Sequence, residues 1–250
     1  MSQAKQMIYD QSEFDLRCEW GAQGVAQLAS ISDVIVIVDV LSFSTCVEIA
    51  TNNGAIIFPY AMRDESVIDY AKSVQAELAS QRWSTTGYSL SPVSVAEIPA
   101  GTRLVLPSPN GSFLSLNTGT IPTLAGCLRN CEAVAQFAHK YGNKIAVIPA
   151  GERWKQDNSL RPAFEDLIGA GAILSYLHGS LSPEAQIAVT AFEAFKNDLL
   201  GYLKKCSSGK ELIAKGFEPD VELAAAYNVS NCVPLFVENA YRKFGFKAPS

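Results

Sequence analysis

Apolar runs and helix-period patterns alternate along the whole chain. Residues 34–38 are all Val or Ile, with no polar alternation, so both faces of this strand are expected to be covered, as in a parallel sheet between helix layers. Residues 63–78 instead place their apolar groups at a period of about 3.6 residues, which predicts an amphipathic helix. The remaining pattern predicts strands within 7–17, 55–58, 103–106, 123–130, 144–149 and 233–237, and helices at 21–29, 46–52, 131–141, 163–177, 183–205, 211–215 and 219–227.

The order of these elements predicts the fold class. Strands alternate with helices throughout, which is typical of a three-layer α/β/α sandwich with a mostly parallel or mixed central sheet. Residues 80–101 are rich in Ser, Thr, Pro and Gly and are predicted to form a long loop of a kind that is often functional. With 250 residues, 48% of them hydrophobic, we expect a single domain over 1–250, with a smaller subdomain in its C-terminal part left open.

The first buried strand ends in a carboxylate and a turn rich in hydroxyl groups. Asp39 follows the apolar run, and Ser44 and Thr45 precede the helix predicted from Cys46. An acid, hydroxyl groups and the free N–H groups of a helix start together suit a metal and an anion. The alternative is that Asp39 only accepts N–H groups of its own loop, and that the hydroxyl groups only cap the helix.

Two later loops carry polar groups at predicted strand ends as well. The turn at 107–112 contains Asn110-Gly111, which favours a bend that exposes successive N–H groups to an anion, although a plain surface turn is the commoner outcome. The charged loop at 152–162 lies between a strand and a helix, where open α/β proteins bind ligands. Glu165 and Asp166 occupy the first turn of that helix, a position that helix electrostatics alone also favours for acids.

Charge and cysteine content limit the classes of partner. The formal net charge is -5 and no basic run exceeds two residues, so no nucleic-acid partner is expected. No stretch approaches the roughly 18 apolar residues of a membrane span, and the first residues lack a signal-peptide pattern, so we expect a cytoplasmic protein without a membrane partner. Six cysteines without a CxxC pair are expected to be reduced.

The absence of several known motifs excludes some classes of catalytic site. The chain has no GxSxG nucleophile elbow and no phosphate-binding loop, and a content of only two histidines argues against a zinc site or a histidine triad. Carboxylates, amide turns and hydroxyl groups remain. This set suits Mg²⁺ holding a phosphate, since Mg²⁺ prefers oxygen ligands and polarises phosphoryl oxygens.

Five short motifs, in this order along the chain, resemble the 2-phosphosulfolactate phosphatase family. They lie at 38–45, 109–112, 126–130, 164–172 and 207–220, and Val233-Pro234 is similar to the family's ending. The resemblance implies a Mg²⁺-dependent phosphatase on a three-layer α/β/α fold, which removes phosphate from a small sulfonated three-carbon acid in coenzyme M biosynthesis. It implies a small phosphorylated substrate and leaves a homodimer open.

The matched motifs also suggest the site. Asp39, Glu165 and Asp166 are expected to act as catalytic groups that bind the metal or position water. The groups expected on the phosphate or substrate are those of Ser44, Thr45, Arg82, Asn110, Gly111, Ser112, Asn130 and Lys210.

Three positions depart from the family pattern, and each departure removes a charge from a loop expected near the site. The family's Arg after Asp-Val-Leu is Ser42 here, an acid of its Gly-Glu-Arg segment is Gln81, and the acid of its Gly-Phe-Asp segment is Ser89. Two alternatives therefore stay open. One is a catalytically altered member that binds a small anionic metabolite or a partner, and the other is a phosphatase for a different small phosphate ester.

Overall fold

A nine-stranded mixed sheet forms the centre of the protein. The computed structural model describes residues 8–62, 64–84 and 86–244. The strand order is β1-β7-β2-β6-β10-β11-β3-β5-β4, and β8 and β9 form a separate hairpin. The strands are β1 (Leu16–Cys18), β2 (Val34–Val38), β3 (Ile56–Tyr60), β4 (Glu77–Leu78), β5 (Arg103–Pro107), β6 (Thr123–Gly126), β7 (Ile145–Pro149), β8 (Glu152–Arg153), β9 (Leu160–Arg161), β10 (Pro234–Val237) and β11 (Ala240–Lys243).

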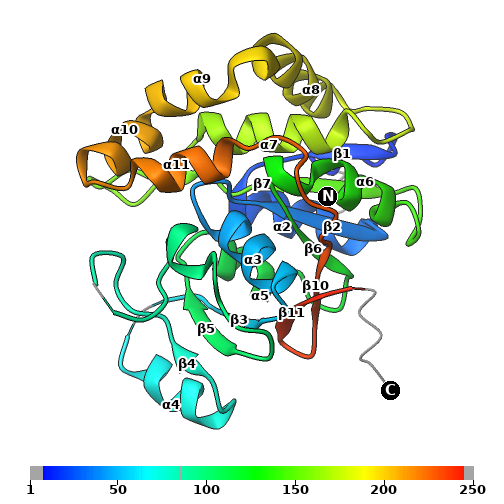
Figure 1. Cartoon of the computed structure of the whole chain (residues 1–250). Coiled ribbons are helices and arrows are strands. Elements are labelled where there is room, and N and C mark those ends of the chain that lie inside the picture. Colours follow the sequence, from blue (N-terminus) through cyan, green and yellow to red (C-terminus); the bar gives the residue numbers. More distant parts are fainter. Residues whose placement is uncertain (1–7, 63, 85, 245–250) are drawn as a thin grey trace.

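The sheet consists of two parallel groups joined by an antiparallel hairpin. Strands β1, β7, β2 and β6 are parallel to one another, and so are β3, β5 and β4. The hairpin β10–β11 pairs antiparallel with β6 on one side and with β3 on the other. Three successive antiparallel pairings reverse the direction, so the two groups point opposite ways. Figure 1 shows the hairpin between them, in red.

Helices cover both faces of the sheet. Figure 1 shows α7 to α11 across the top of the β2 group and α3 in front of the sheet. The α-helices are α2 (Gly21–Leu28), α3 (Phe43–Asn52), α4 (Ser66–Ser73), α5 (Gly111–Leu116), α6 (Cys131–Ala138), α7 (Phe164–Leu174), α8 (Pro183–Phe195), α9 (Leu199–Lys205), α10 (Ser207–Ala214) and α11 (Glu218–Ala225).

Strand β2 shows why the apolar run lacks alternation. Val34, Val36 and Val38 pack into the cluster that contains the buried faces of α6, α7 and α8. Ile35 and Ile37 pack on the opposite face, against α2 and α5. All five side chains are fully buried, and each contributes about 1.5–3 kcal/mol relative to an exposed position. The predicted α/β sandwich with a mixed sheet is confirmed.

Two glycines bring α7 close to its neighbours. A Cβ at Gly169 would lie 2.7 Å from Val40 Cγ2, and a Cβ at Gly171 would lie 2.0 Å from the carbonyl oxygen of Ala188 on α8. Only glycine allows both approaches, because either Cβ would overlap atoms that cannot move freely. Helix α7 is therefore fixed between the sheet and α8, and so is its N-terminal turn.

Several predicted boundaries were wrong. The helix predicted at 63–78 extends only over Ser66–Ser73, because the backbone turns at Gln75, with φ of 51°, and residues 77 and 78 pair with β5 as β4. Arg63 lies outside the described residues. The 183–205 helix is divided by the short 3₁₀ turn Lys196–Asp198 into α8 and α9.

Other errors concern elements that begin early or were not predicted. Helix α3 begins at Phe43 and α10 at Ser207, ahead of the predicted starts at 46 and 211. The predicted turn after β5 leads directly into α5, the 152–162 loop contains the hairpin β8–β9, and strand β11 follows the predicted strand at 233–237 without having been predicted itself. Of the helices in the described residues, none has the length and apolar character needed to cross a membrane.

Candidate active site

Asp39 lies directly after β2, at the carboxyl end of the strand. Its side chain is 6% exposed and accepts two backbone hydrogen bonds, from Phe43 N–H to Oδ1 (3.2 Å) and from Gly111 N–H to Oδ2 (2.8 Å). Burial raises the pKa of Asp39 to about 6; the two N–H groups oppose this effect and the charge of Glu165 adds to it. A buried carboxyl at a strand end whose pKa is raised in this way is a candidate functional group.

Gly111 makes this arrangement sterically possible. Its N–H reaches Asp39 from the first residue of α5, and a Cβ at this position would lie 2.2 Å from Phe43 Cδ1 and 2.9 Å from Asp39 Oδ2. A residue with a side chain would displace either the ring or the carboxylate. The Asn-Gly sequence therefore fixes the distance between the ends of β2 and β5.

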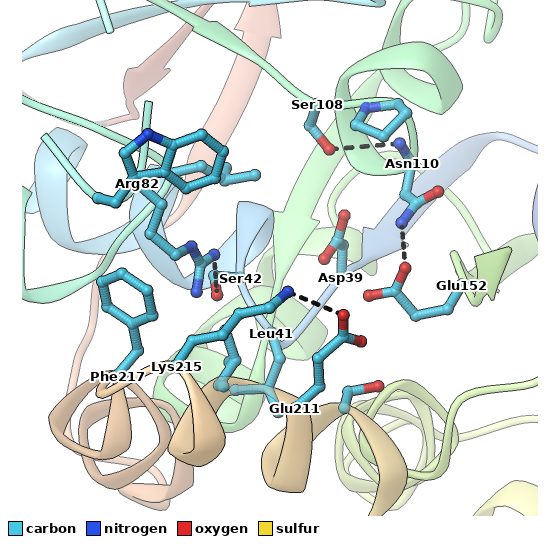
Figure 2. Close-up of a pocket in the computed structure, with 15 residues that line it drawn as sticks. Asp39, Leu41, Ser42, Arg82, Ser108, Asn110, Glu152, Glu211, Lys215 and Phe217 are labelled. Atoms are coloured by element: carbon cyan, nitrogen blue, oxygen red, sulfur yellow. Dashed lines mark hydrogen bonds and ion pairs between the residues drawn. The ribbon is translucent and has the colours of Figure 1, made fainter. Parts of the chain in front are cut away.

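Glu152 approaches the same place from the end of β7. Asn110 Nδ2 donates to Glu152 Oε2 at 3.0 Å (Figure 2). Burial, followed by the charge of Asp39, raises the pKa of Glu152 to about 7, while the bond from Asn110 opposes this. Asp39 and Glu152 thus face one cavity, and repulsion from Asp39 favours the protonated form of Glu152.

Asp166, in the first turn of α7, accepts hydrogen bonds from the segments that follow two neighbouring strands. Its Oδ1 accepts the N–H of Val40 at 2.8 Å, and its Oδ2 accepts the N–H of Gly151 at 2.9 Å. Burial and the charge of Asp39 raise its pKa well above the ordinary value. Since Val40 follows β2 and Gly151 follows β7, this carboxylate holds both loops in register.

Glu165 lies beside Asp166 and is also buried, at 2% exposed. Its Oε2 accepts a hydrogen bond from the thiol of Cys206 at 3.3 Å. Neither acid of this first helical turn is among the described residues that line the cavity at Asp39. Both are buried outside the cavity lining.

A cavity of about 270 Å³ opens between the strand ends and the C-terminal helices (Figure 2). The wall at the strand ends carries acids and amides, and the wall formed by the loop and the C-terminal helices carries Arg82, Lys215, aromatic rings and one acid, Glu211, which pairs with Lys215. The residues that line it are Asp39, Leu41, Ser42, Arg82, Trp83, Leu90, Ser108, Pro109, Asn110, Glu152, Ser208, Glu211, Leu212, Lys215 and Phe217.

Arg82 is a half-buried cation of this cavity, with 15% of its side chain exposed. Its Nη2 donates to the hydroxyl of Ser42 at 2.9 Å, and its Nη1 lies 3.3 Å from Oδ2 of Asp220. The guanidinium also lies 5.5 Å from the ring centre of Phe217, within the range of a cation–π contact. The loop at 80–101 thus brings a cation to the position next to Ser42, where the family pattern would place an arginine.

Four predicted phosphate-binding side chains instead hold the backbone. The hydroxyl groups of Ser44 and Thr45 are buried and donate to the carbonyl oxygens of Ile37 (3.0 Å) and Val40 (2.8 Å). Ser112 donates to the carbonyl of Leu106, and Asn130 bonds to backbone groups of residues 125, 127 and 232.

The two predicted cations differ in position. Arg82 lines the cavity, whereas Lys210 is exposed on α10 and is not among the described lining residues. Lys215, at the end of α10, lines the cavity instead and pairs with Glu211 at 2.8 Å.

Sequence reasoning missed Glu152, Ser108, Lys215 and Asp220 as individual site residues. Ser108 and Glu152 follow β5 and β7 closely, so the rule that ligands bind at strand ends was the signal available for both. Lys215 and Asp220 gave no signal beyond their place in the matched 207–220 motif, because only the fold of α10 and α11 over the cavity shows their role.

The carboxylates of the site are too few to enclose Mg²⁺ by themselves. In the described ranges 8–62, 64–84 and 86–244, no three His, Cys, Asp or Glu side chains gather closely enough to hold one ion. Asp39 and Glu152 do face the cavity together, and burial, followed by the charge of neighbouring acids, raises the pKa of each; a bound cation would offset that negative charge. Mg²⁺ is commonly bound through one or two carboxylates plus substrate phosphate, so these residues fit an ion shared with substrate.

Known proteins are similar to this chain over most of its length. A model of the family described as 2-phosphosulpholactate phosphatase matches residues 23–239. The 2-phosphosulfolactate phosphatase of Methanothermobacter thermautotrophicus is 27% identical over 208 residues, which cover 82% of this chain and 87% of the relative. A protein of Carboxydothermus hydrogenoformans named "Probable 2-phosphosulfolactate phosphatase" is 30% identical over 208 residues, or 80% and 84% of the two chains. The chain therefore belongs to the 2-phosphosulfolactate phosphatase family.

Proposed function

We propose that this protein is a Mg²⁺-dependent phosphatase that hydrolyses a small phosphorylated acid, with 2-phosphosulfolactate as the substrate that its relatives' names suggest. The observation that carries the proposal is the cavity with Asp39 and Glu152 on one wall and Arg82 and Lys215 on the other. A phosphate ester between these walls would meet a base on one side and cations on the other, as phosphoryl transfer requires.

The acidic wall would supply the proton transfer. Glu152, with a pKa of about 7, is suited to take a proton from the attacking water near neutral pH. Asn110 orients it through the 3.0 Å hydrogen bond. Asp166 would act indirectly, by holding the loops that carry Asp39 and Glu152 in place.

The other wall would bind charge. Arg82 and Lys215 would attract the phosphoryl oxygens, whose negative charge an Arg guanidinium matches in geometry. Asp39 would hold Mg²⁺, with Glu152 next to it. When bound, the ion would polarise the phosphoryl oxygens and offset the repulsion between the acids.

A second candidate function is binding of a small anionic metabolite without turnover. The observation that favours it is Ser42, an uncharged residue on the cavity wall whose hydroxyl accepts a bond from Arg82. The cavity then holds fewer cations than the family pattern implies.

One experiment separates the two functions. Phosphate release from 2-phosphosulfolactate, and from 2-phospholactate, which lacks the sulfonate, is measured with Mg²⁺ and with EDTA, for wild type and Asp39→Asn. The phosphatase predicts Mg²⁺-dependent release that Asp39→Asn abolishes. Binding of either ester in calorimetry without any release supports the binding protein and contradicts the phosphatase. Phosphate release that is unchanged in EDTA would contradict the proposed Mg²⁺ dependence.

A further inference from the structure

Asp220 collects hydrogen bonds from one loop although it lies far from that loop in sequence. It occupies the first turn of α11 and is 1% exposed. Its Oδ1 accepts the hydroxyl of Ser91 at 2.6 Å and the N–H of Val93 at 3.1 Å, and its Oδ2 lies 3.3 Å from Nη1 of Arg82. All three donors belong to the 80–101 loop.

The charge of Asp220 has its counter-charge in Arg82. A carboxylate at 1% exposure costs several kcal/mol unless a cation and hydrogen bonds compensate it. The ion pair with Arg82 and the two bonds from Ser91 and Val93 provide this compensation. A helix-dipole preference accounts for an acid in the first turn of α11, but it does not account for the guanidinium facing that acid.

Arg82 is in turn restrained on three sides. Asp220 accepts from Nη1, Ser42 accepts from Nη2, and the ring of Phe217 lies against the guanidinium. A guanidinium has more N–H donors than these two bonds use, and its remaining donors belong to a residue that lines the cavity. Restraint before binding lowers the entropy cost of gripping an anion.

We infer that Asp220 is a positioning residue, which orients Arg82 for the anionic group of the substrate and couples α11 to the substrate-binding loop. Asp220 is not among the described residues that line the cavity, so it acts through Arg82. The inference rests on the proposed function for the identity of the anion, a phosphate. It implies that α11 controls substrate affinity without contacting substrate.

The simplest competing explanation is that Asp220 only anchors the loop. Ser91→Ala separates the two roles, because it removes one loop anchor and leaves the pair between Arg82 and Asp220 intact. If anchoring were the whole role, Ser91→Ala would weaken binding at least as much as Asp220→Asn, whose amide oxygen can still accept from Ser91 and Val93. Asp15→Asn serves as a control, since it breaks an ion pair with Lys144, and neither residue is among the described residues that line the cavity.

The test measures KM and kcat for the phosphate ester, and the Kd of inorganic phosphate by calorimetry. Asp220→Asn is expected to raise KM and the phosphate Kd about tenfold to hundredfold, the loss typical of a charge-assisted hydrogen bond, with a smaller change in kcat. Arg82→Lys should show a similar loss, and the double variant should be no weaker than Arg82→Lys alone, because both changes act on one interaction. Asp15→Asn should leave KM and Kd unchanged.

Two results would overturn the inference: multiplied losses in the double variant, or a loss in Ser91→Ala at least as large as that in Asp220→Asn. Asp220→Glu, which keeps the charge but shifts the guanidinium, covers the case in which Asp220→Asn does not fold; an unchanged Kd in Asp220→Glu would also contradict it. The phosphate Kd needs no turnover. A wild type that releases no phosphate but binds it in an Asp220-dependent way therefore contradicts the proposed function and supports this inference.

Discussion

The two walls of the cavity are built in different ways. The acidic wall comes from strand ends: Asp39 follows β2, Asn110 follows β5 and Glu152 follows β7. The cationic wall comes from a long loop and the C-terminal helices; its cations are Arg82 and Lys215, and the acid Glu211 on this wall pairs with Lys215. The first wall is fixed by the sheet and by backbone N–H groups, whereas the second depends on side-chain pairs such as Arg82 with Asp220.

The difference suggests a division of work. Groups that must keep sub-ångström geometry for chemistry lie on the rigid sheet, and groups that select the substrate lie on segments with fewer backbone restraints. Changes to the acidic wall should therefore act on kcat, and changes to the cationic wall on KM. Four substitutions test this division, from the largest expected effect to the smallest.

Asp39→Asn should lower kcat by about a thousandfold or more, with KM changed far less. The substitution keeps the shape but removes the charge, and it places an amide N–H₂ against the N–H of either Phe43 or Gly111. Steady-state kinetics with saturating Mg²⁺ check this. A loss that appears mainly in KM would contradict the division between the walls.

Glu152→Gln should lower kcat by about a hundredfold and also stabilise the protein at pH 8 in EDTA. The folded-state pKa of Glu152 is raised from 4.5 to about 7, so its contribution to stability is present below pH 4.5 and is lost as pH rises through about 7. The Gln side chain does not ionise, so the variant should have a free energy of unfolding about 1–3 kcal/mol higher than wild type at pH 8. Urea unfolding at pH 8 and pH 4 measures this, and a stabilisation equal at both pH values would contradict the pKa assignment.

Gly111→Ala should reduce kcat by about tenfold to hundredfold and lower the free energy of unfolding by about 1–3 kcal/mol. The added Cβ would displace Phe43 or the carboxylate of Asp39, as its 2.2 Å and 2.9 Å distances require. Gly119→Ala is the control: a Cβ there meets nothing within 4 Å, so only backbone strain at its φ of 68° remains. Equal losses of kcat in the two variants would show that contact with Asp39 does not matter.

Lys215→Met should raise KM by a few fold, the smallest of these effects, because Lys215 is 56% exposed and already paired with Glu211. Lys210→Met, on the same helix, tests the residue that sequence reasoning favoured. Its side chain is exposed away from the lining residues, so KM should stay nearly constant. Comparing the two variants at low and high salt measures the difference, and a larger effect of Lys210→Met would reverse the assignment.

The sequence allowed prediction of the part of the site that depends on the sheet. A polar-free run of five β-branched residues favours a strand covered on both faces, so the pattern alone places Asp39 at a strand end. The motifs led us to expect Asp39 and the turn at Asn110 in one site. The directions of the strands that precede them do not by themselves explain why the two lie close together. Strands β2 and β5 belong to oppositely directed groups, and their ends meet through the N–H of Gly111.

The cationic wall was much harder to predict, for a physical reason. Arg82 lies in a loop without periodicity, and its partner Asp220 is 138 residues further along the chain. Short-range pattern carries no information about such pairs. For Ser44 and Thr45 the sequence suggested phosphate ligands, but in the structure both hydroxyl groups donate to backbone carbonyls. Helix α3 begins earlier than predicted and buries them.

The hairpin β10–β11 has a consequence for how this protein is made. Both parallel groups of strands are complete by Pro149, yet the hairpin that joins them begins only at Pro234. During synthesis, β6 and β3 therefore each keep an unpaired edge until residues 234–243 have left the ribosome. An unpaired strand edge can pair with strands of other chains, and pairing between segments far apart in sequence is slow. Until the hairpin forms, the nascent chain is expected to be prone to misassembly, and holdase chaperones are the expected protection at that stage.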